Sequence, residues 1–185
     1  GHMWELYAMW AWFLVFFSHV LTHNGDASGA TAAFATFAVI GIGAVGCWVG
    51  GYLGDRWGRT NTTAFMMAVS GTCALLIGLV SDAPAWLVLG IGLIWGFSVV
   101  ADSAQFSTIV TELADQSYVG TALTLQLAMG FSLTVATIWL IPVLEESFGW
   151  RWAFAFLAPG PALGVLAMLR LRSSPEAALI AGGRG

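Results

Sequence analysis

Three polar side chains share one face of an apolar stretch, and one of them is a carboxyl group that could bind and release a proton. Asp102 is the one acidic residue that we place inside an apolar run, and Ser98 and Gln105 lie on about the same helical face. A carboxylate in the middle of a membrane costs about 2.5–3.5 kcal/mol on insertion scales. We therefore expect Asp102 to be protonated when shielded and to release its proton when water reaches it, with Ser98 and Gln105 orienting it or a solute. The structural alternative is a hydrogen bond from Asp102 to a neighbouring helix.

A pair of histidines lies near the end of the first apolar run. His19 and His23 stand four residues apart on a helical face with Trp12 and Phe16, and Asp26 follows closely. Two histidines and a carboxylate could ligate a metal ion, so a metal channel or membrane enzyme is an alternative. Histidines near a membrane surface more often expose their polar tip to water. We therefore predict no metal, no cofactor and no enzyme.

The composition excludes a soluble domain. Apolar residues make up 58% of the chain, charged residues 9%, and lysine is absent, whereas soluble domains carry about 25% charged residues. Nor is there a basic patch that would bind nucleic acid. Six apolar runs of roughly membrane-spanning length lie at residues 6–21, 30–53, 62–81, 85–110, 119–144 and 152–169. Because backbone groups in lipid must be satisfied internally, each run should be a helix, and the fold class is an all-α membrane protein.

The arginines indicate the orientation of these helices. Five of the six lie in the terminal segments or alternate loops on one side, and one lies on the other side. The five are Arg56, Arg59, Arg170, Arg172 and Arg184, and the one is Arg151. Because cytoplasmic loops carry the excess of arginine, we expect both termini in the cytoplasm and the chain in the inner (plasma) membrane.

The six runs are expected to form one helical domain with close packing at glycines. Residues 4–172 hold the bundle, residues 173–185 form a cytoplasmic tail, and residues 1–3, Gly-His-Met, resemble the remnant of a removed tag. Gly46 and Gly50 stand one helical turn apart in the second run. Small residues on one face let a neighbouring membrane helix approach closely, so we expect a helix contact there.

The connection between the second and third runs carries the most specific motif. Residues 51–60 read Gly-Tyr-Leu-Gly-Asp-Arg-Trp-Gly-Arg-Thr. This stretch resembles the loop that marks the major facilitator superfamily, and it matches each fixed position except the last, where Thr60 replaces a basic residue. Residues 101–107 and 149–154 resemble later helices of that superfamily. The similarity covers nearly the whole chain, as a carboxy-terminal six-helix half.

The resemblance implies a conformational-switch loop. The residues that match it are Gly51, Gly54, Asp55, Arg56, Gly58 and Arg59. In the family, the motif arginine pairs with an acid at the inner end of the fourth helix, so we expect Arg59 to meet Glu112 or Asp115. The motif aspartate caps a helix of the other half, which would be the role of Asp55 toward a partner bundle.

The resemblance also implies a central cavity lined by the first and fourth helices. His19 and Asp102, the deepest ionisable groups, fall on those two helices. We expect them to lie roughly 15 Å apart along the membrane normal, too far for an ion pair. The other expected lining residues are Trp12, Phe16, Phe106, Gln126 and Thr134.

The function implied by the resemblance is that of a secondary transporter working by alternating access. Family members usually have two six-helix halves, each built from two inverted three-helix repeats. Gly58 and Arg59 in one hairpin have a possible counterpart in Gly149 and Arg151 in another. We expect a small-molecule substrate, proton coupling and a second six-helix half, supplied by a second copy of the chain in the lipid bilayer. The alternative is an isolated half of a twelve-helix carrier that acts only as a structural membrane module.

Overall fold

Six membrane-spanning helices make up the fold. The computed structural model describes residues 1–26 and 28–183, and these contain no strand and six helices long and apolar enough to cross a membrane. The expected all-α class and the six spans are confirmed. The first three are α1 (His2–His23), α2 (Gly29–Trp57) and α3 (Arg59–Leu79). The fourth span is α4 (Ala85–Ala101) with α5 (Ser103–Leu113), the fifth is α6 (Val119–Phe148), and the sixth is α7 (Trp150–Ala153), the 3-10 turn η1 (Phe154–Leu157) and α8 (Pro159–Arg172).

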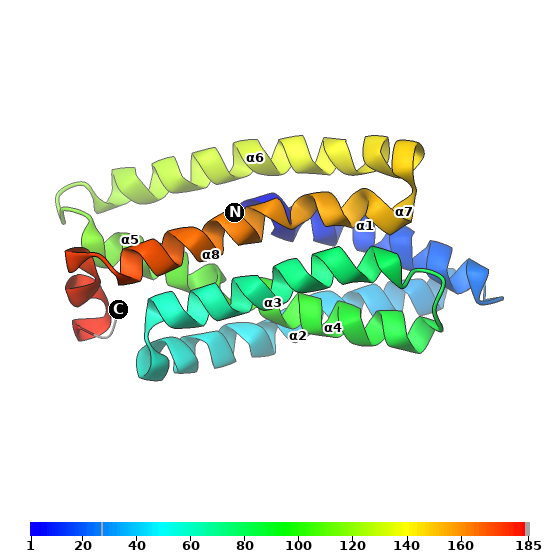
Figure 1. Ribbon diagram of the computed structural model, residues 1–185, viewed down its shortest axis with the longest axis horizontal. Coiled ribbons are helices and arrows are strands. Elements are labelled where there is room, and N and C mark those ends of the chain that lie inside the picture. The colour runs from blue at the N-terminus through cyan, green and yellow to red at the C-terminus, as the bar shows by residue number, and fades with distance from the viewer. Residues whose placement is uncertain (27, 184–185) are drawn as a thin grey trace.

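The helices lie side by side along the long axis of the bundle (Figure 1). One end holds the α2–α3 turn, the α5–α6 loop and the C-terminus, and the opposite end holds the other three connections. The N-terminus lies about midway between the two ends, which differs from the expectation that both termini share one end. Helix α1 has 22 residues, against 30 in α6.

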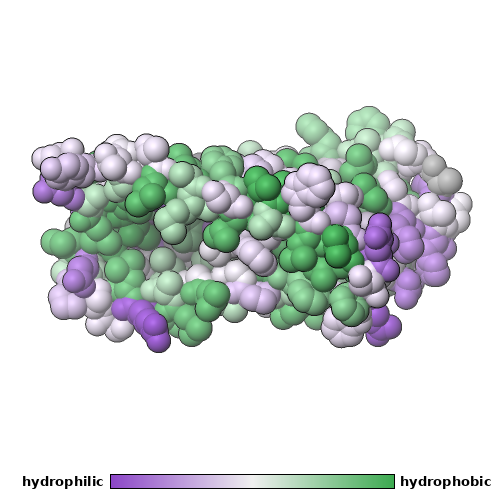
Figure 2. Space-filling view, turned by 90° about the horizontal axis from the view of Figure 1, so that it is seen from above, coloured by the Kyte–Doolittle hydropathy of each residue, from purple (hydrophilic) through white to green (hydrophobic). Residues whose placement is uncertain are grey.

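The surface of the bundle fits a bilayer. Figure 2 shows hydrophilic residues gathered toward the two ends, and hydrophobic residues over much of the length between them. Large apolar side chains remain on the outside, among them Phe34 at 76%, Trp48 at 74% and Trp139 at 75% exposure. A soluble protein rarely exposes so much contiguous apolar surface, whereas lipid or an apolar partner covers it without cost.

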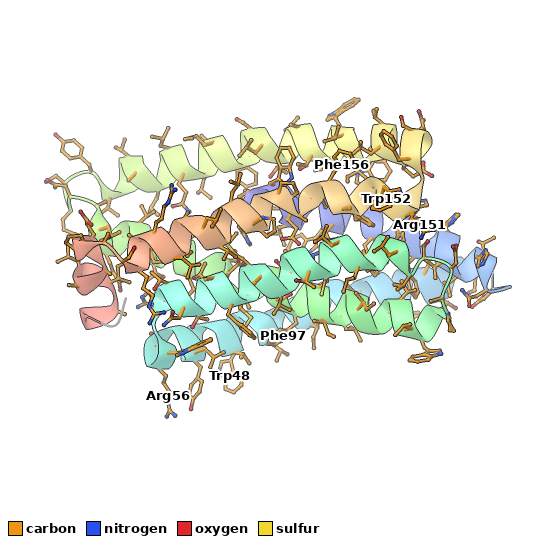
Figure 3. All side chains as sticks on the ribbon, viewed as in Figure 1. Trp48, Arg56, Phe97, Arg151, Trp152 and Phe156 are labelled. Carbon is orange, nitrogen blue, oxygen red and sulfur yellow. The ribbon has the colours of Figure 1, made fainter. Side chains whose placement is uncertain are left out.

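The described arginines lie toward the two ends of the bundle. Figure 3 labels Arg56 at one end and Arg151 toward the other. Arg170 and Arg172 stand in the last turn of α8, at the same end as Arg56, and we call this the arginine-rich end. Arg184, which contributed to the sequence-based orientation, falls outside the described residues. The bias of arginine toward one end supports a cytoplasmic location for it, and this orientation stays a prediction.

Single cysteines placed at the two ends should label from opposite sides of the membrane. Asp82 in the α3–α4 loop and Ser173 after α8 are both exposed, so each tolerates substitution by cysteine. With Cys47 and Cys73 replaced by serine, a membrane-impermeant maleimide should label Asp82→Cys on intact cells and Ser173→Cys only after permeabilisation. Labelling of Ser173→Cys on intact cells would contradict the orientation.

Helix α2 packs against the fourth span at backbone contact. A Cβ added to Gly46 would overlap the carbonyl oxygen of Phe97, and one added to Gly50 would overlap that of Ala101. Because lipid is as apolar as a helix surface, such close approach and the van der Waals contact it gives hold membrane helices together. The close packing expected at Gly46 and Gly50 is present.

Two helix hairpins at opposite ends of the bundle use the same kind of turn. Gly58 has φ 96° and joins α2 to α3, and Gly149 has φ 72° and joins α6 to α7. Both values lie in the left-handed region, where a side chain would be strained. The shared turn supports the correspondence between the two hairpins, although the inverted repeat as a whole stays a prediction.

Candidate functional site

Asp102 stands at a break in the fourth span. The residue ends α4 and begins α5 with φ −86° and ψ −15°, and Gln105 N donates a hydrogen bond to Asp102 O at 3.0 Å. This bond spans three residues instead of four, so the helix is tightened locally. The Asp102 side chain is almost fully buried, with 1% of the residue exposed. A carboxyl therefore occupies an irregular point in the middle of a membrane span.

The nearest charged contact of Asp102 comes from the start of α1. His2 Nδ1 lies 2.9 Å from Asp102 Oδ1, which is an ion-pair distance without the geometry of a hydrogen bond. The imidazole also lies 5.3 Å from the ring of Phe106. His2 belongs to the segment that we interpret as a tag remnant, so this contact assigns no role to a native histidine.

Ser98 and Gln105 have partners other than Asp102. Ser98 Oγ donates to Ile94 O at 2.8 Å within its own helix. Gln105 Nε2 donates to Gly50 O at 3.1 Å, which ties α5 to α2. The expectation that these two side chains orient the Asp102 carboxyl gains no support from these hydrogen bonds, and the alternative that they orient a solute stays a prediction.

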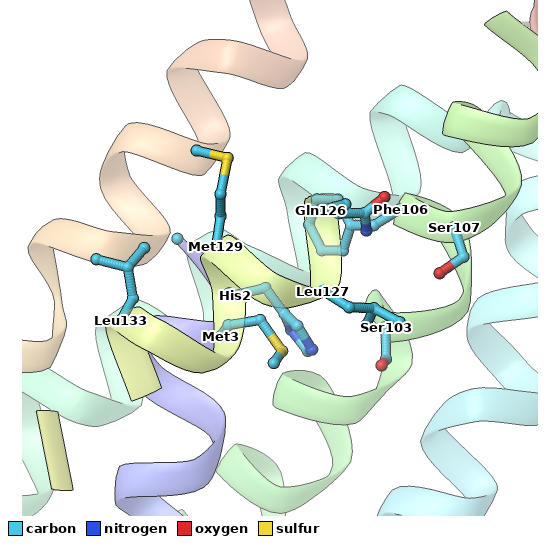
Figure 4. Close-up of a pocket in the computed structure, with 11 residues that line it drawn as sticks. His2, Met3, Ser103, Phe106, Ser107, Gln126, Leu127, Met129 and Leu133 are labelled. Carbon is cyan, nitrogen blue, oxygen red and sulfur yellow. The ribbon is translucent and has the colours of Figure 1, made fainter. Parts of the chain in front are cut away.

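A cleft of about 340 Å³ opens beside the Asp102 break (Figure 4). One face of α5 and one face of α6 form two of its walls, and residues 1–3, the expected tag remnant, form the third. Phe106 and Gln126 line it as expected, and Ser103, the neighbour of Asp102, lines it as well. The cleft therefore lies next to the buried carboxyl in the sequence, although Asp102 is not itself among the lining residues.

Three residues expected in the cavity instead hold α1 in the bundle. Trp12 Nε1 donates to Ile138 O of α6 at 2.9 Å, and Thr134 Oγ1 donates to Met3 O at 3.1 Å. Phe16 is fully buried and packs edge-on against Phe154, with ring centres 5.3 Å apart. Helical periodicity could not separate these core contacts from a cavity lining, because both faces are apolar.

The histidines at the outer part of α1 are exposed. His19 and His23 both lie on the surface, and His19 is distant from the cleft residues. Within residues 1–26 and 28–183, no group of three or more His, Cys, Asp or Glu side chains is placed to hold a metal ion. The alternative of a histidine-based metal channel or enzyme thus gains no support.

A second buried carboxyl escaped the sequence analysis. Glu5 of α1 is 1% exposed, and it accepts hydrogen bonds from Trp95 Nε1 of α4 at 2.6 Å and from Ser70 Oγ of α3 at 3.0 Å. The first apolar run begins at residue 6, so Glu5 lies just outside it. Helix α1 begins four residues earlier, at His2, so Glu5 lies inside the helix.

The motif loop brings Arg59 onto the fourth span. Arg59 opens α3, and its guanidinium donates to Glu112 through Nε at 3.2 Å and Nη2 at 3.1 Å, and to Gln105 Oε1 at 3.3 Å. The expected contact between Arg59 and Glu112 is present, whereas Asp115 Oδ1 accepts a hydrogen bond from Ser117 N at 2.8 Å. Within the loop, Asp55 lies 3.6 Å from Arg59.

The other loop residues support this geometry. Gly54 faces the amide of Gln105, where a Cβ would come within 2.7 Å of its oxygen. Arg56 lies over the ring of Tyr52 at 4.5 Å, and Gly51 faces open space. The contact of Asp55 with a partner bundle stays a prediction.

The C-terminal segment closes over the Arg59–Glu112 pair. The 3-10 helix η2 (Pro175–Gly182) folds against α5 at the arginine-rich end. Ile180 is fully buried, and Ala181 N donates to Glu112 Oε2 at 3.1 Å. The segment after residue 172, expected as a tail, therefore packs against the bundle at Ile180 and Ala181.

Removing Glu112 should free this segment with little effect on the bundle. A hydrogen bond to a charged acceptor is worth about 1.5–3 kcal/mol, so Glu112→Ala should speed amide hydrogen exchange across η2 by about tenfold or more. The part-exposed ion pair itself is worth only about 0–1 kcal/mol, so the thermal midpoint should hardly move. Asp115→Ala is the matched control, and equal exchange in both variants would contradict the contact.

Comparisons with known proteins identify the family to which the chain belongs. A family model described as the Major Facilitator Superfamily matches residues 6–185. Among solved structures, the chain is similar to the proton:xylose symporter XylE bound to 6-bromo-6-deoxy-D-glucose, with a TM-score of 0.66 and 15% sequence identity over 98% of this chain. The chain covers 48% of the symporter chain and so spans about half its length. A comparison with curated proteins gave no match. The chain belongs to the Major Facilitator Superfamily, whose members are membrane transporters and not enzymes.

Proposed function

We propose that this chain is one half of a secondary transporter that moves a small solute across a membrane by alternating access. The observation that carries the proposal is the extent of the structural match, in which 98% of this chain corresponds to 48% of the symporter chain. A carrier of this kind encloses its solute between two bundles, and the matched half supplies one of them.

The second bundle in this proposal is another copy of the chain. The outside of α2 supports it with a row of exposed apolar side chains, namely Phe34, Phe37, Val45, Trp48 and Tyr52. A facing bundle would bury these side chains, although lipid covers them equally well. If the partner is instead a different half within a longer carrier, this chain alone is a folded membrane module without transport activity.

The coupling ion in this proposal is the proton, carried by Asp102. Ser103 and Phe106, which follow Asp102 in the sequence, line the cleft. A small widening of the cleft would therefore bring water to the carboxyl. The matched structure is that of a proton:xylose symporter, which supports the same ion. The sequence has no lysine, and the described arginines stand in the end turns of their helices. Such a cleft favours a neutral or cationic solute over an anion.

The test measures the mass of the assembly in lipid and its transport activity. Native mass spectrometry of the chain in lipid nanodiscs should give the mass of two copies. Proteoliposomes that contain a pH-sensitive dye should show proton movement when a transported solute is added from a panel of sugars, amino acids and organic cations. Single-copy particles that move no proton with any solute would favour the isolated half over the proposed transporter.

A further inference from the structure

Glu5 joins three helices through one carboxyl group. Oε1 accepts the hydrogen bond from Trp95 of α4, and Oε2 accepts the one from Ser70 of α3, so each oxygen has its own donor. Trp95 is fully buried and Ser70 is 1% exposed. A buried carboxyl is tolerated when it is neutral or when hydrogen bonds satisfy its charge, and this site offers both possibilities.

Ser70 can satisfy Glu5 in two protonation states. Its hydroxyl oxygen lies 3.0 Å from Glu5 Oε2 and 3.2 Å from Met67 O. When Glu5 is charged, Ser70 donates to Oε2. When a proton is bound to Oε2, the carboxyl O–H donates to Ser70 Oγ, and the Ser70 hydroxyl hydrogen turns to Met67 O. The Trp95 N–H donates to Oε1 throughout, so Glu5 keeps two hydrogen bonds without movement of any heavy atom.

We propose that Glu5 is a proton-binding site of this bundle, with Ser70 as the rotating hydroxyl that accommodates the proton. A proton from water forms an O–H bond with one carboxylate oxygen of Glu5. This O–H bond breaks when the proton returns to water. Because hydrogen bonds to a charged carboxylate are stronger than those to a neutral one, proton binding loosens the junction of α1, α3 and α4. The inference rests on the proposed function for its purpose, since a transporter can use such a change in helix contact.

Few other titratable groups face Glu5. The α4–α5 junction contributes Asp102, α3 contributes the thiol of Cys73, and α1 contributes the N-terminal amine of Gly1, which belongs to the expected tag remnant. The acidic residues of α6 stand in its last turn, at Glu145 and Glu146, and the basic residues of α8 stand in its last turn as well. Within the described part of the chain, Asp102 is thus the carboxyl whose protonation could be mistaken for that of Glu5.

Infrared spectroscopy distinguishes the two carboxyls without any solute. The full chain in lipid bilayers should show C=O stretching absorption of protonated buried carboxyls, one component of which belongs to Glu5 and disappears as pH rises. Glu5→Gln should remove this component and keep the fold, because the amide accepts from Trp95 and donates to Ser70 Oγ. Asp102→Asn is the matched control and should remove only absorption that belongs to Asp102. Ser70→Ala keeps Glu5 but removes its partner, so the Glu5 component should move to higher frequency.

The outcomes separate this inference from the proposed function. The band shift in Ser70→Ala supports the site even if Glu5→Gln does not fold. The site is overturned if Glu5→Gln removes no component of the band, if the whole band vanishes in Asp102→Asn, or if no pH-dependent carboxyl band exists. A chain that transports nothing but shows the Glu5 band retains the proton site and loses the transporter. A chain that transports solute with protons but shows no Glu5 band retains the proposed transport function and loses the Glu5 proton site.

Discussion

Asp102→Asn should abolish solute accumulation driven by a pH gradient while leaving solute exchange intact. Asparagine has nearly the same shape as aspartate and cannot carry a proton, so the variant should bind solute and change conformation without coupling. In proteoliposomes, the ratio of internal to external solute should fall to one under an imposed pH gradient, and counterflow of labelled solute should continue. The helical content and thermal midpoint should match those of the unaltered chain.

The matched control is Asp82→Asn, which makes the same chemical change at an exposed position in the α3–α4 loop. It should accumulate solute normally. A purely structural Asp102 predicts a different pattern, in which the asparagine side chain keeps the break between α4 and α5 and transport is unaltered. Unchanged gradient-driven uptake in Asp102→Asn would therefore refute the coupling role.

The six spans could be predicted because a long apolar segment in lipid must satisfy its backbone hydrogen bonds internally, as a helix does. Their ends could not, because polar end turns are helical too: α6 continues to Phe148, four residues past its apolar run. No proline or glycine next to Asp102 predicts the break there. The span packs at this point against the glycine face of α2, where Gly50 faces the carbonyl oxygen of Ala101, and a local pattern does not contain that contact.

Some contacts of the candidate site could be predicted from the sequence and others could not, for a physical reason. The Arg59–Glu112 contact joins two groups that prefer the same end of the membrane, and the family motif pointed to it. The inward and lipid-facing sides of a membrane helix are both apolar, so Trp12 and Phe16 could not be assigned to cavity or core from hydropathy. Glu5 was missed because a single polar residue at the edge of a run resembles the end of a helix.

Gly50→Ala should destabilise the bundle strongly, and Gly51→Ala should not. A Cβ at Gly50 overlaps the carbonyl oxygen of Ala101, and backbone cannot swing away as a side chain can. Overpacking of this kind costs about 1–3 kcal/mol. Gly51 is the adjacent residue of the same helix and faces open space. Alanine there gains up to about 1 kcal/mol of helix propensity, so the two variants should move the thermal midpoint in opposite directions.

The same overlap should also reach the candidate site. Ala101 immediately precedes Asp102, and Gly50 O accepts the hydrogen bond from Gln105, so separating α2 from the fourth span displaces both sides of the break. If Gly50→Ala still folds at low temperature, it should lose the gradient-driven uptake that the unaltered chain shows in proteoliposomes. Equal thermal midpoints in Gly50→Ala and Gly51→Ala, together with uptake by Gly50→Ala equal to that of the unaltered chain, would mean that the close contact at Gly50 holds neither the bundle nor the position of Asp102.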